Sequence, residues 1–265
     1  MKIYSFLTLT AIAALAAVTG CKKEAEKSPI DVNYSGSNGA SLKVIYTSPY
    51  FKRDSVHIKI NDARVSNTFL SPTTSNTPIP FPGGGLNTGG SNFPDYFLLA
   101  PGDTKIAVAI PKLRTNEDSI VKFTGNVTLD AGKKYSAFIA DTAANSRIVL
   151  VPESGVAPAD STVSVFKFVN LIPNQPAIDL YFKNVLVSGN IAYGAYSPEF
   201  TLPSDSTGQW AIRIAGAAPA SAAIVTYPTG TTNQTIPKRR IMTVFCKGYT
   251  GAAAPRLPVI SLIYN

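Results

Sequence analysis

The apolar residues of this 265-residue chain fall into short runs, and beyond residue 21 they do not recur with the 3.6-residue period of a helix. The runs are about 5–8 residues long, alternate apolar with polar positions, and recur about every ten residues. Pro, Gly, Asn and Asp separate them, and the chain holds 20 Pro and 19 Gly. This pattern predicts an all-β chain built from antiparallel β-sandwiches.

The pattern occurs twice along the chain, as an internal repeat. The segment "SVHIKINDARVSN" (55–67) aligns without gaps on "AIDLYFKNVLVSG" (177–189), at an offset of 122. The preceding strands align at 41–51 and 165–175, and later segments align at offsets of 104 and 106. We therefore predict two tandem sandwich domains, at 40–155 and 160–265, joined by the Pro/Gly/Ala/Ser linker "PESGVAPADST".

Each copy contains a predicted hairpin, with Asn61-Asp62 and Lys183-Asn184 in the turns. His57, the single histidine, lies in the first of these hairpins, and Asp179 takes its place in the second. Because the apolar neighbours persist while this position changes, we interpret His57 as a solvated strand residue and not as a catalytic base.

The first copy carries about eighteen extra residues before Pro94. They are rich in Pro and Gly, which excludes them from a central strand and predicts a long surface loop at 71–93. Such loops are either functional or disordered, and both readings stay open. Phe81 and Phe93 are its candidate contact residues.

The first 20 residues have the character of a signal peptide, with a basic Lys2, an apolar core and small residues at the end. The following Val18-Thr19-Gly20-Cys21 resembles the lipobox of bacterial lipoproteins, which implies lipidation of Cys21 and a membrane anchor. Residues 21–39 then read as a lipidated flexible tether. We expect an outer-membrane lipoprotein of the Bacteroidota type, facing either the periplasm or the cell surface.

The second copy also carries a family resemblance. Its Pro173, Asp179, Tyr193-Gly194, Ser197-Pro198 and Leu202-Pro203 resemble the motifs of the domain of unknown function 4397 family, and the first copy matches them weakly. This resemblance implies immunoglobulin-like sandwich modules in an exported or envelope-anchored protein. It brings no catalytic residues.

No catalytic motif stands out. The chain lacks a Gly-x-Ser-x-Gly elbow and a phosphate-binding Gly-Lys-Ser/Thr loop. One histidine, with Cys21 lipidated and Cys246 in an apolar run, excludes the usual His/Cys zinc sites. We expect no enzyme activity, cofactor or metal, and no nucleic-acid partner, although the net charge is +8, because the basic residues are scattered.

The expected function is therefore binding or display of a glycan, matrix or protein partner at the envelope. A structural spacer and an accessory subunit of an uptake or secretion system are the alternatives. Tyr193 and Tyr196 are candidate contact residues at a turn of the second copy, although they could equally seal its core. Five Asp-Ser/Thr triplets resemble O-glycosylation acceptors of Bacteroidota, with candidate sites at Ser55, Ser119, Thr142, Ser161 and Ser206.

Overall fold

The computed structural model describes residues 38–48, 57–65, 68–69, 77–78, 96–112, 117–141, 145–253 and 256–265. All regular secondary structure in these ranges is β-strand, which confirms the predicted all-β class. Within the same ranges there is no helix of the length and apolarity needed to cross a membrane.

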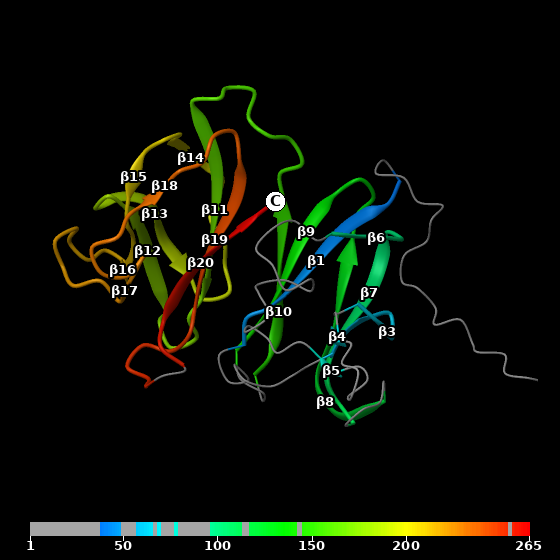
Figure 1. Cartoon of the computed structure of the whole chain (residues 1–265). Coiled ribbons are helices and arrows are strands. Elements are labelled where there is room, and N and C mark those ends of the chain that lie inside the picture. Colours follow the sequence, from blue (N-terminus) through cyan, green and yellow to red (C-terminus); the bar gives the residue numbers. More distant parts are fainter. Residues whose placement is uncertain are drawn as a thin grey trace, which may run out of the picture.

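Sandwich 1 pairs the sheet β3-β2-β7-β8 with the sheet β10-β9-β1-β6, and sandwich 2 pairs β13-β12-β16-β17 with β14-β11-β19-β20 (Figure 1). The strands of sandwich 1 are β1 (Ala40–Tyr46), β2 (His57–Ile60), β3 (Ala63–Arg64), β6 (Phe97–Leu99), β7 (Gly102–Pro111), β8 (Asp118–Leu129), β9 (Lys134–Ala140) and β10 (Arg147–Glu153). Those of sandwich 2 are β11 (Val163–Leu171), β12 (Ala177–Phe182), β13 (Val185–Ala192), β14 (Phe200–Pro203), β16 (Trp210–Ile214), β17 (Val225–Tyr227), β19 (Ile241–Lys247) and β20 (Val259–Tyr264). Two small pairs complete the set: β4 (Thr68–Phe69) with β5 (Thr77–Pro78), and β15 (Thr207–Gly208) with β18 (Gln234–Thr235).

The two sandwiches have the same strand order. Each strand of sandwich 1 has a counterpart at the same place in the corresponding sheet of sandwich 2. The sheets are not purely antiparallel as predicted, because β1 pairs with β9, and β11 with β19, in parallel. These parallel pairs join strands distant in sequence, which the alternation pattern within single strands could not reveal.

Both predicted hairpin turns are present. The φ angles are 49° and 68° at Asn61 and Asp62, and 54° and 59° at Lys183 and Asn184. Positive φ at both central residues is the type I′ geometry that matches the twist of a two-residue hairpin.

Three apolar layers lie between the four sheets. The first fills sandwich 1 and the second fills sandwich 2. The third, here called the interface layer, joins the two sandwiches and consists of Ile45, Phe138, Ala140, Val149, Val151, Val169, Leu171, Phe245 and Ile263. The sheets that contain β1 and β11 are therefore covered on both faces, which is why their strands read as nearly continuous apolar runs.

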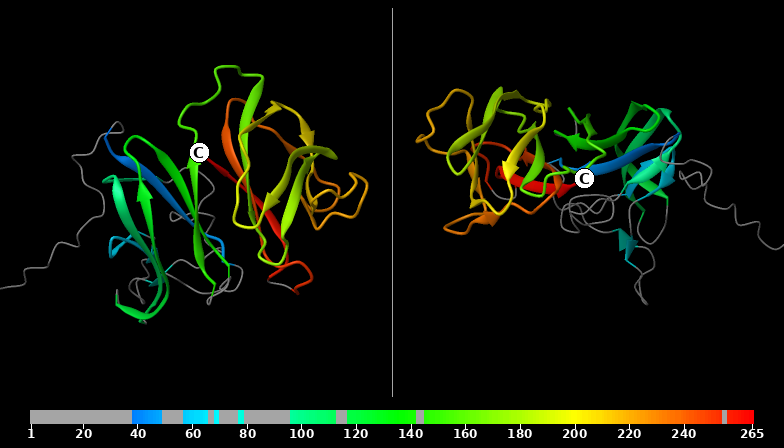
Figure 2. Two further views of the ribbon diagram at one scale, coloured as in Figure 1. Left: turned by 180° about the vertical axis from the view of Figure 1, so that it is seen from behind. Right: turned by 90° about the horizontal axis from the view of Figure 1, so that it is seen from above.

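The interface layer is nearly two-fold symmetric. Ile45 lies opposite Phe138 across β1 and β9, and Val169 lies opposite Phe245 across β11 and β19, so the two phenylalanines are counterparts. Their rings contact each other with centroids 5.1 Å apart. The sandwiches thus pack side by side through equivalent faces (Figure 2).

This register corrects one alignment. Phe138 corresponds to Phe245, an offset of 107, and not to Val244 as the offset of 106 would require. Because side chains alternate between the faces of a strand, an error of one residue exchanges core and interface positions. The offset of 122 is confirmed by the matching strand pairs of β2 and β12.

Three further residues can be placed in the fold. Cys246 is free and wholly buried in the core of sandwich 2, where burial raises the thiol pKa to about 12, as expected for structural filler. Asp179 occupies the position that corresponds to His57, where the sequence predicts a solvated residue, but it is only 4% exposed. Its carboxylate accepts hydrogen bonds from the amides of Asn190 (2.6 Å) and Gly216 (2.8 Å). His57 lies in β2, but its side chain falls outside the described set.

Candidate binding groove between the two sandwiches

A groove with a volume of about 580 Å³ lies where the two sandwiches and their linker meet. Its lining comes from both domains and mixes aromatic, apolar and charged side chains: Asp130, Lys133, Tyr135, Leu150, Pro152, Glu153, Ser154, Lys167, Tyr196 and Glu199. Concave surfaces with a few convergent polar groups at domain junctions are the usual location of ligand sites. We call this surface the groove.

Tyr196 supplies the exposed aromatic surface of the groove. Its side chain is 41% exposed, whereas its backbone forms a β-bridge with Val169. The next residue, Ser197, is buried and exchanges bonds with Phe168: its amide donates to the Phe168 carbonyl (2.8 Å), and its hydroxyl accepts from the Phe168 amide (2.9 Å). The ring is thus exposed on a fixed backbone, which lowers the entropy lost when a ligand binds.

Tyr135 also lines the groove, and its side chain is largely buried. That hydroxyl donates to the Asp130 carboxylate over 3.0 Å. Burial, together with the nearby Asp130 carboxylate, raises the pKa of Tyr135. Asp130 itself is exposed, so it can accept a hydrogen bond from a ligand hydroxyl.

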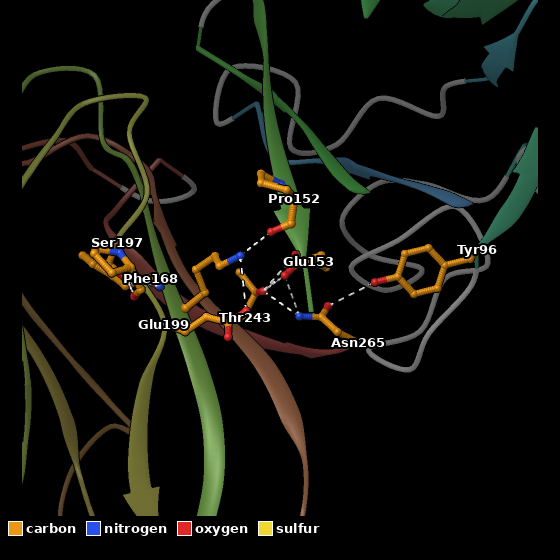
Figure 3. A network of polar contacts seen from close by, with 10 residues as sticks. Tyr96, Pro152, Glu153, Phe168, Ser197, Glu199, Thr243 and Asn265 are labelled. Atoms are coloured by element: carbon orange, nitrogen blue, oxygen red, sulfur yellow. Dashed lines mark hydrogen bonds and ion pairs between the residues drawn. The ribbon is translucent and has the colours of Figure 1, made fainter. Parts of the chain in front are cut away.

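A polar cluster is built around Glu153, which lines the groove (Figure 3). The Glu153 carboxylate accepts hydrogen bonds from the Thr243 hydroxyl (3.0 Å) and from the Asn265 side-chain amide (3.0 Å). Asn265 also donates to the Thr243 hydroxyl (2.8 Å). Sandwich 1 and sandwich 2 are therefore joined by polar as well as apolar contacts.

Two lysines flank this cluster at equivalent positions of the two copies. Lys43 is fully buried and donates to the Tyr264 carbonyl and the Asn265 side-chain oxygen, both over 2.8 Å. Lys167 donates to the Pro152 carbonyl and lies 3.7 Å from the Glu199 carboxylate. By register, Pro152 is the counterpart of Tyr264 and Glu153 that of Asn265, so each lysine reaches the same backbone position of the other sandwich.

Burial raises the pKa of Glu153, and the Ser136 hydroxyl, both lysines and Thr243 partly oppose this shift. Burial likewise raises the pKa of Tyr96, whose ring lies 4.7 Å from the Lys43 ammonium, and the Glu153 charge adds to the effect. The groups around Glu153 are thus desolvated and interconnected, whereas Asp130, Tyr196 and Glu199 of the groove lining are exposed.

The structure separates the two predicted tyrosines. Tyr193 lies against sandwich 1: its hydroxyl donates to Asp141 (2.6 Å), and the Arg147 guanidinium stacks 4.1 Å from its ring centre. Residue 194 has a φ of 75°, a left-handed conformation that favours glycine. Tyr193 is therefore an interdomain contact, and of the two predicted tyrosines Tyr196 is the one that lines the groove.

The other predicted sites have mixed positions. Ser119 and Ser161 are exposed and Ser206 is half-buried, so the first two are the more accessible glycosylation candidates. Ser55, Thr142, Cys21, Phe81 and Phe93 lie outside the described residues, as does the 71–93 loop apart from β5. Within the described ranges no three His, Cys, Asp or Glu side chains are grouped as metal ligands would be.

Four residues of the groove were not predicted from the sequence: Glu153, Lys167, Tyr135 and Glu199. One signal was available, since the aligned segments 41–51 and 165–175 each place a lysine, Lys43 or Lys167, inside an apolar strand. A buried lysine needs a partner, so two equivalent ones could have indicated a polar interface.

Comparisons with known proteins leave the family open. No protein-family model matches the chain, and no curated protein does. Among solved structures, a streptococcal virulence factor studied for alpha-glucan binding is 11% identical to this chain, with a TM-score of 0.25. The match covers 85% of this chain and 97% of the virulence factor. A candidate adhesin from Bacteroides ovatus is 9% identical, covering 82% and 92%, with a TM-score of 0.18. At these scores neither likeness supports a conclusion about this chain.

Proposed function

We propose that this chain is a non-catalytic envelope protein that binds a glycan in the groove between its two sandwiches. The observation that carries this proposal is the Tyr196 ring, exposed on a fixed backbone beside charged groups from both domains. The likeness of the second copy to the domain of unknown function 4397 family agrees with such a role but supplies no ligand.

Glycan chemistry suits this lining. A sugar ring presents apolar C–H faces and many hydroxyls, and a tyrosine presents an apolar face with a polar tip. The exposed carboxylates of Asp130 and Glu199 can accept from hydroxyls, while Lys133 can donate to them. The groove spans both domains, so a ligand several sugar units long would contact both.

A glycan array probed with the full chain in detergent, followed by titration of the best ligand, tests this proposal. Tyr196→Ala should weaken binding by about tenfold or more, because a central aromatic contact is worth about 2 kcal/mol. Leu186→Ala, a similarly exposed apolar residue of β13 outside the groove, should bind like the wild type. A wild-type chain that bound no glycan, or equal affinity of both variants, would contradict the proposal.

We also propose that the chain is held at the outer membrane by lipid on Cys21, as the lipobox-like sequence indicates. Cys21→Ala should move the protein from the membrane fraction to the soluble fraction of its host, and intact mass should fall by the mass of the acyl groups. Protease treatment of whole cells would distinguish a surface-facing from a periplasmic protein.

The second candidate function is a stiff spacer, which the interface layer favours. Nine apolar residues and the Glu153 cluster join the sandwiches, so they should move as one body. A spacer predicts that groove variants leave every envelope phenotype intact, whereas a receptor predicts that Tyr196→Ala reproduces the deletion phenotype.

A further inference from the structure

The sheet β13-β12-β16-β17 lies on the side of sandwich 2 away from sandwich 1 (Figure 2). Residues of this sheet and of its loops line a second pocket. It has a volume of about 360 Å³ and is lined by Lys183, Asn184, Thr207, Gly208, Gln209, Ala211, Arg213, Thr226 and Asn233. We call it the outer pocket. Two of its lining residues are cations and the others are neutral, so it contains no carboxylate.

Arg213 is held rigidly at this pocket. It is 6% exposed, its Nε donates to the Ser221 carbonyl (3.0 Å), and its Nη2 donates to the Asn184 side-chain oxygen (3.1 Å). The guanidinium also stacks on the Tyr181 ring, 4.6 Å from its centre. The remaining nitrogen, Nη1, is buried and meets no acceptor among the described residues.

A buried donor without an acceptor is costly, because its lost hydrogen bond to water is not replaced. The carboxylate on the same sheet face does not supply the acceptor: Asp179 lies directly across from Arg213 in the pairing of β12 and β16, but both of its oxygens accept from backbone amides. The two residues form no ion pair within the usual limit. An anionic oxygen in the outer pocket would supply what Nη1 lacks.

Lys183 brings the second cation to the pocket. Its stem passes so close to Gly208 that a Cβ at 208 would lie 2.2 Å from the Lys183 Cγ, so glycine is needed there. Lys183 forms no ion pair with any residue that the structure describes. It occupies a left-handed turn position that lysine seldom adopts.

The opposite wall is also fixed in place. The Gln209 side-chain nitrogen lies within hydrogen-bonding distance of the carbonyls of Pro228, Gly230 and Thr232, at 3.2, 2.5 and 3.0 Å, and its two N–H groups are shared among them. These bonds hold the 228–232 segment beside Asn233, which contributes a polar side chain to the lining. The outer pocket is therefore bordered by hydrogen-bonded backbone and contains amide and hydroxyl groups next to its cations.

The described residues of sandwich 1 do not repeat the two cations of this pocket. By register, Ala109 stands where sandwich 2 has Arg213, and Asn61 and Asp62 stand where it has Lys183 and Asn184. Asp62 is paired there with Lys105 at 2.8 Å. The cationic pocket is thus an addition to one copy of a shared framework, and the fold does not require it.

From these observations we propose that the outer pocket binds the carboxylate of an acidic sugar. Arg213 and Lys183 receive the carboxylate, and the amide and hydroxyl side chains of Asn233, Thr207 and Thr226 bind the sugar hydroxyls. A phosphate or sulfate group would present the same anionic oxygens, so the experiment below separates these sources from a uronic acid.

The test is titration of the full chain with glucuronate, glucose and inorganic sulfate, followed by ligand-observed NMR. We expect glucuronate to bind at least tenfold more tightly than glucose, since a charge-assisted hydrogen bond contributes about 1.5–3 kcal/mol. Lys183→Gln should weaken glucuronate binding by about fivefold to tenfold. Lys238→Gln, a matched change at an exposed lysine outside the pocket, should leave it unchanged.

Sulfate binding as tight as glucuronate binding would overturn the assignment to a sugar acid in favour of a general anion site. Equal binding of glucose and glucuronate, or equal loss in both lysine variants, would overturn the proposal altogether. Arg213→Lys gives a second test if it folds, since it keeps the charge but loses the fixed Nη1. Because Tyr196→Ala leaves the outer pocket unchanged, failure of the groove proposal and failure of this one can be distinguished.

Discussion

The two sandwiches share a framework and differ in what their outer surfaces carry. In both, the outer sheet has the same strand order and a type I′ hairpin at the same place. On its outer face sandwich 2 holds Arg213 and Lys183, where sandwich 1 holds Ala109 and Asn61. Sheet packing constrains only the inward positions, so the outward positions of a duplicated domain are free to acquire a site.

The faces that meet between the sandwiches differ much less. Phe138 packs on its own counterpart Phe245, and Lys43 and Lys167 make equivalent bonds. The main exchange is Glu153 for Asn265, one charged and one neutral acceptor at the same position. The faces through which the two sandwiches contact each other are thus similar, whereas their free surfaces differ.

The largest predicted effect concerns the phenylalanine pair. Phe138→Ala and Phe245→Ala should each lower the free energy of unfolding by about 3–4 kcal/mol, because each leaves a cavity in the interface layer. Symmetry predicts nearly equal losses, measurable by urea denaturation of the full chain. Losses that differed by more than about 1 kcal/mol would contradict the equivalence of the two faces.

The next effect concerns the paired lysines. Lys43→Met should cost about 2–3 kcal/mol, because the Tyr264 carbonyl and Asn265 side chain lose a buried charged donor. Lys167→Met should cost less, since its ammonium lies nearer to solvent beside Glu199. Lys238→Met, at an exposed ion pair, serves as the control and should change stability by less than about 0.5 kcal/mol. Equal losses at all three positions would contradict the buried network.

Glu153 makes the stability of the interface depend on pH, whereas the neutral Asn265 at the equivalent position does not. Burial raises the pKa of Glu153 above the ordinary value of 4.5, so the folded chain holds this proton more tightly than the unfolded chain. Its contribution to stability is fully present below pH 4.5 and is lost as the pH rises through the pKa of the folded state. Glu153→Gln should therefore flatten the dependence of Tm on pH above 4.5.

Glu199→Gln is the control for that experiment, because its carboxylate is 42% exposed. It should keep the wild-type slope of Tm against pH. If Glu153→Gln kept the wild-type slope as well, the pH dependence would have to come from another group, and the desolvated state of Glu153 would be wrong.

The alternation of apolar residues was sufficient to predict the strands, the hairpin turns and the sandwich class. It works because the pleat places Ile58 and Ile60, or Leu180 and Phe182, on one buried face. It failed for Asp179, a polar residue buried by bonds to backbone amides 11 and 37 positions away. Such partners depend on loops that close over the sheet, and no local pattern encodes them.

The groove was predicted only in part for the same reason. Tyr196 was identifiable as an aromatic residue in a turn, but Tyr193, three residues earlier, proved to be an interdomain contact. Their difference arises from how the sandwiches pack, which brings Asp141 and Arg147 onto Tyr193. The outer pocket needed the tertiary structure too, because Lys183, Arg213 and Asn233 lie in different strands and loops.

The smallest predicted effect separates the two hairpin turns. Asparagine adopts positive φ more readily than lysine, so Lys183→Asn should stabilise the chain by about 0.5 kcal/mol. Asn61→Lys should destabilise it by a similar amount, both measured by urea denaturation. If Lys183→Asn instead lowered stability, packing of the lysine stem over Gly208 would outweigh the backbone strain. A stabilising Lys183→Asn that also weakened glucuronate binding would indicate that sandwich 2 keeps a strained lysine for its ligand, where sandwich 1 keeps the relaxed asparagine.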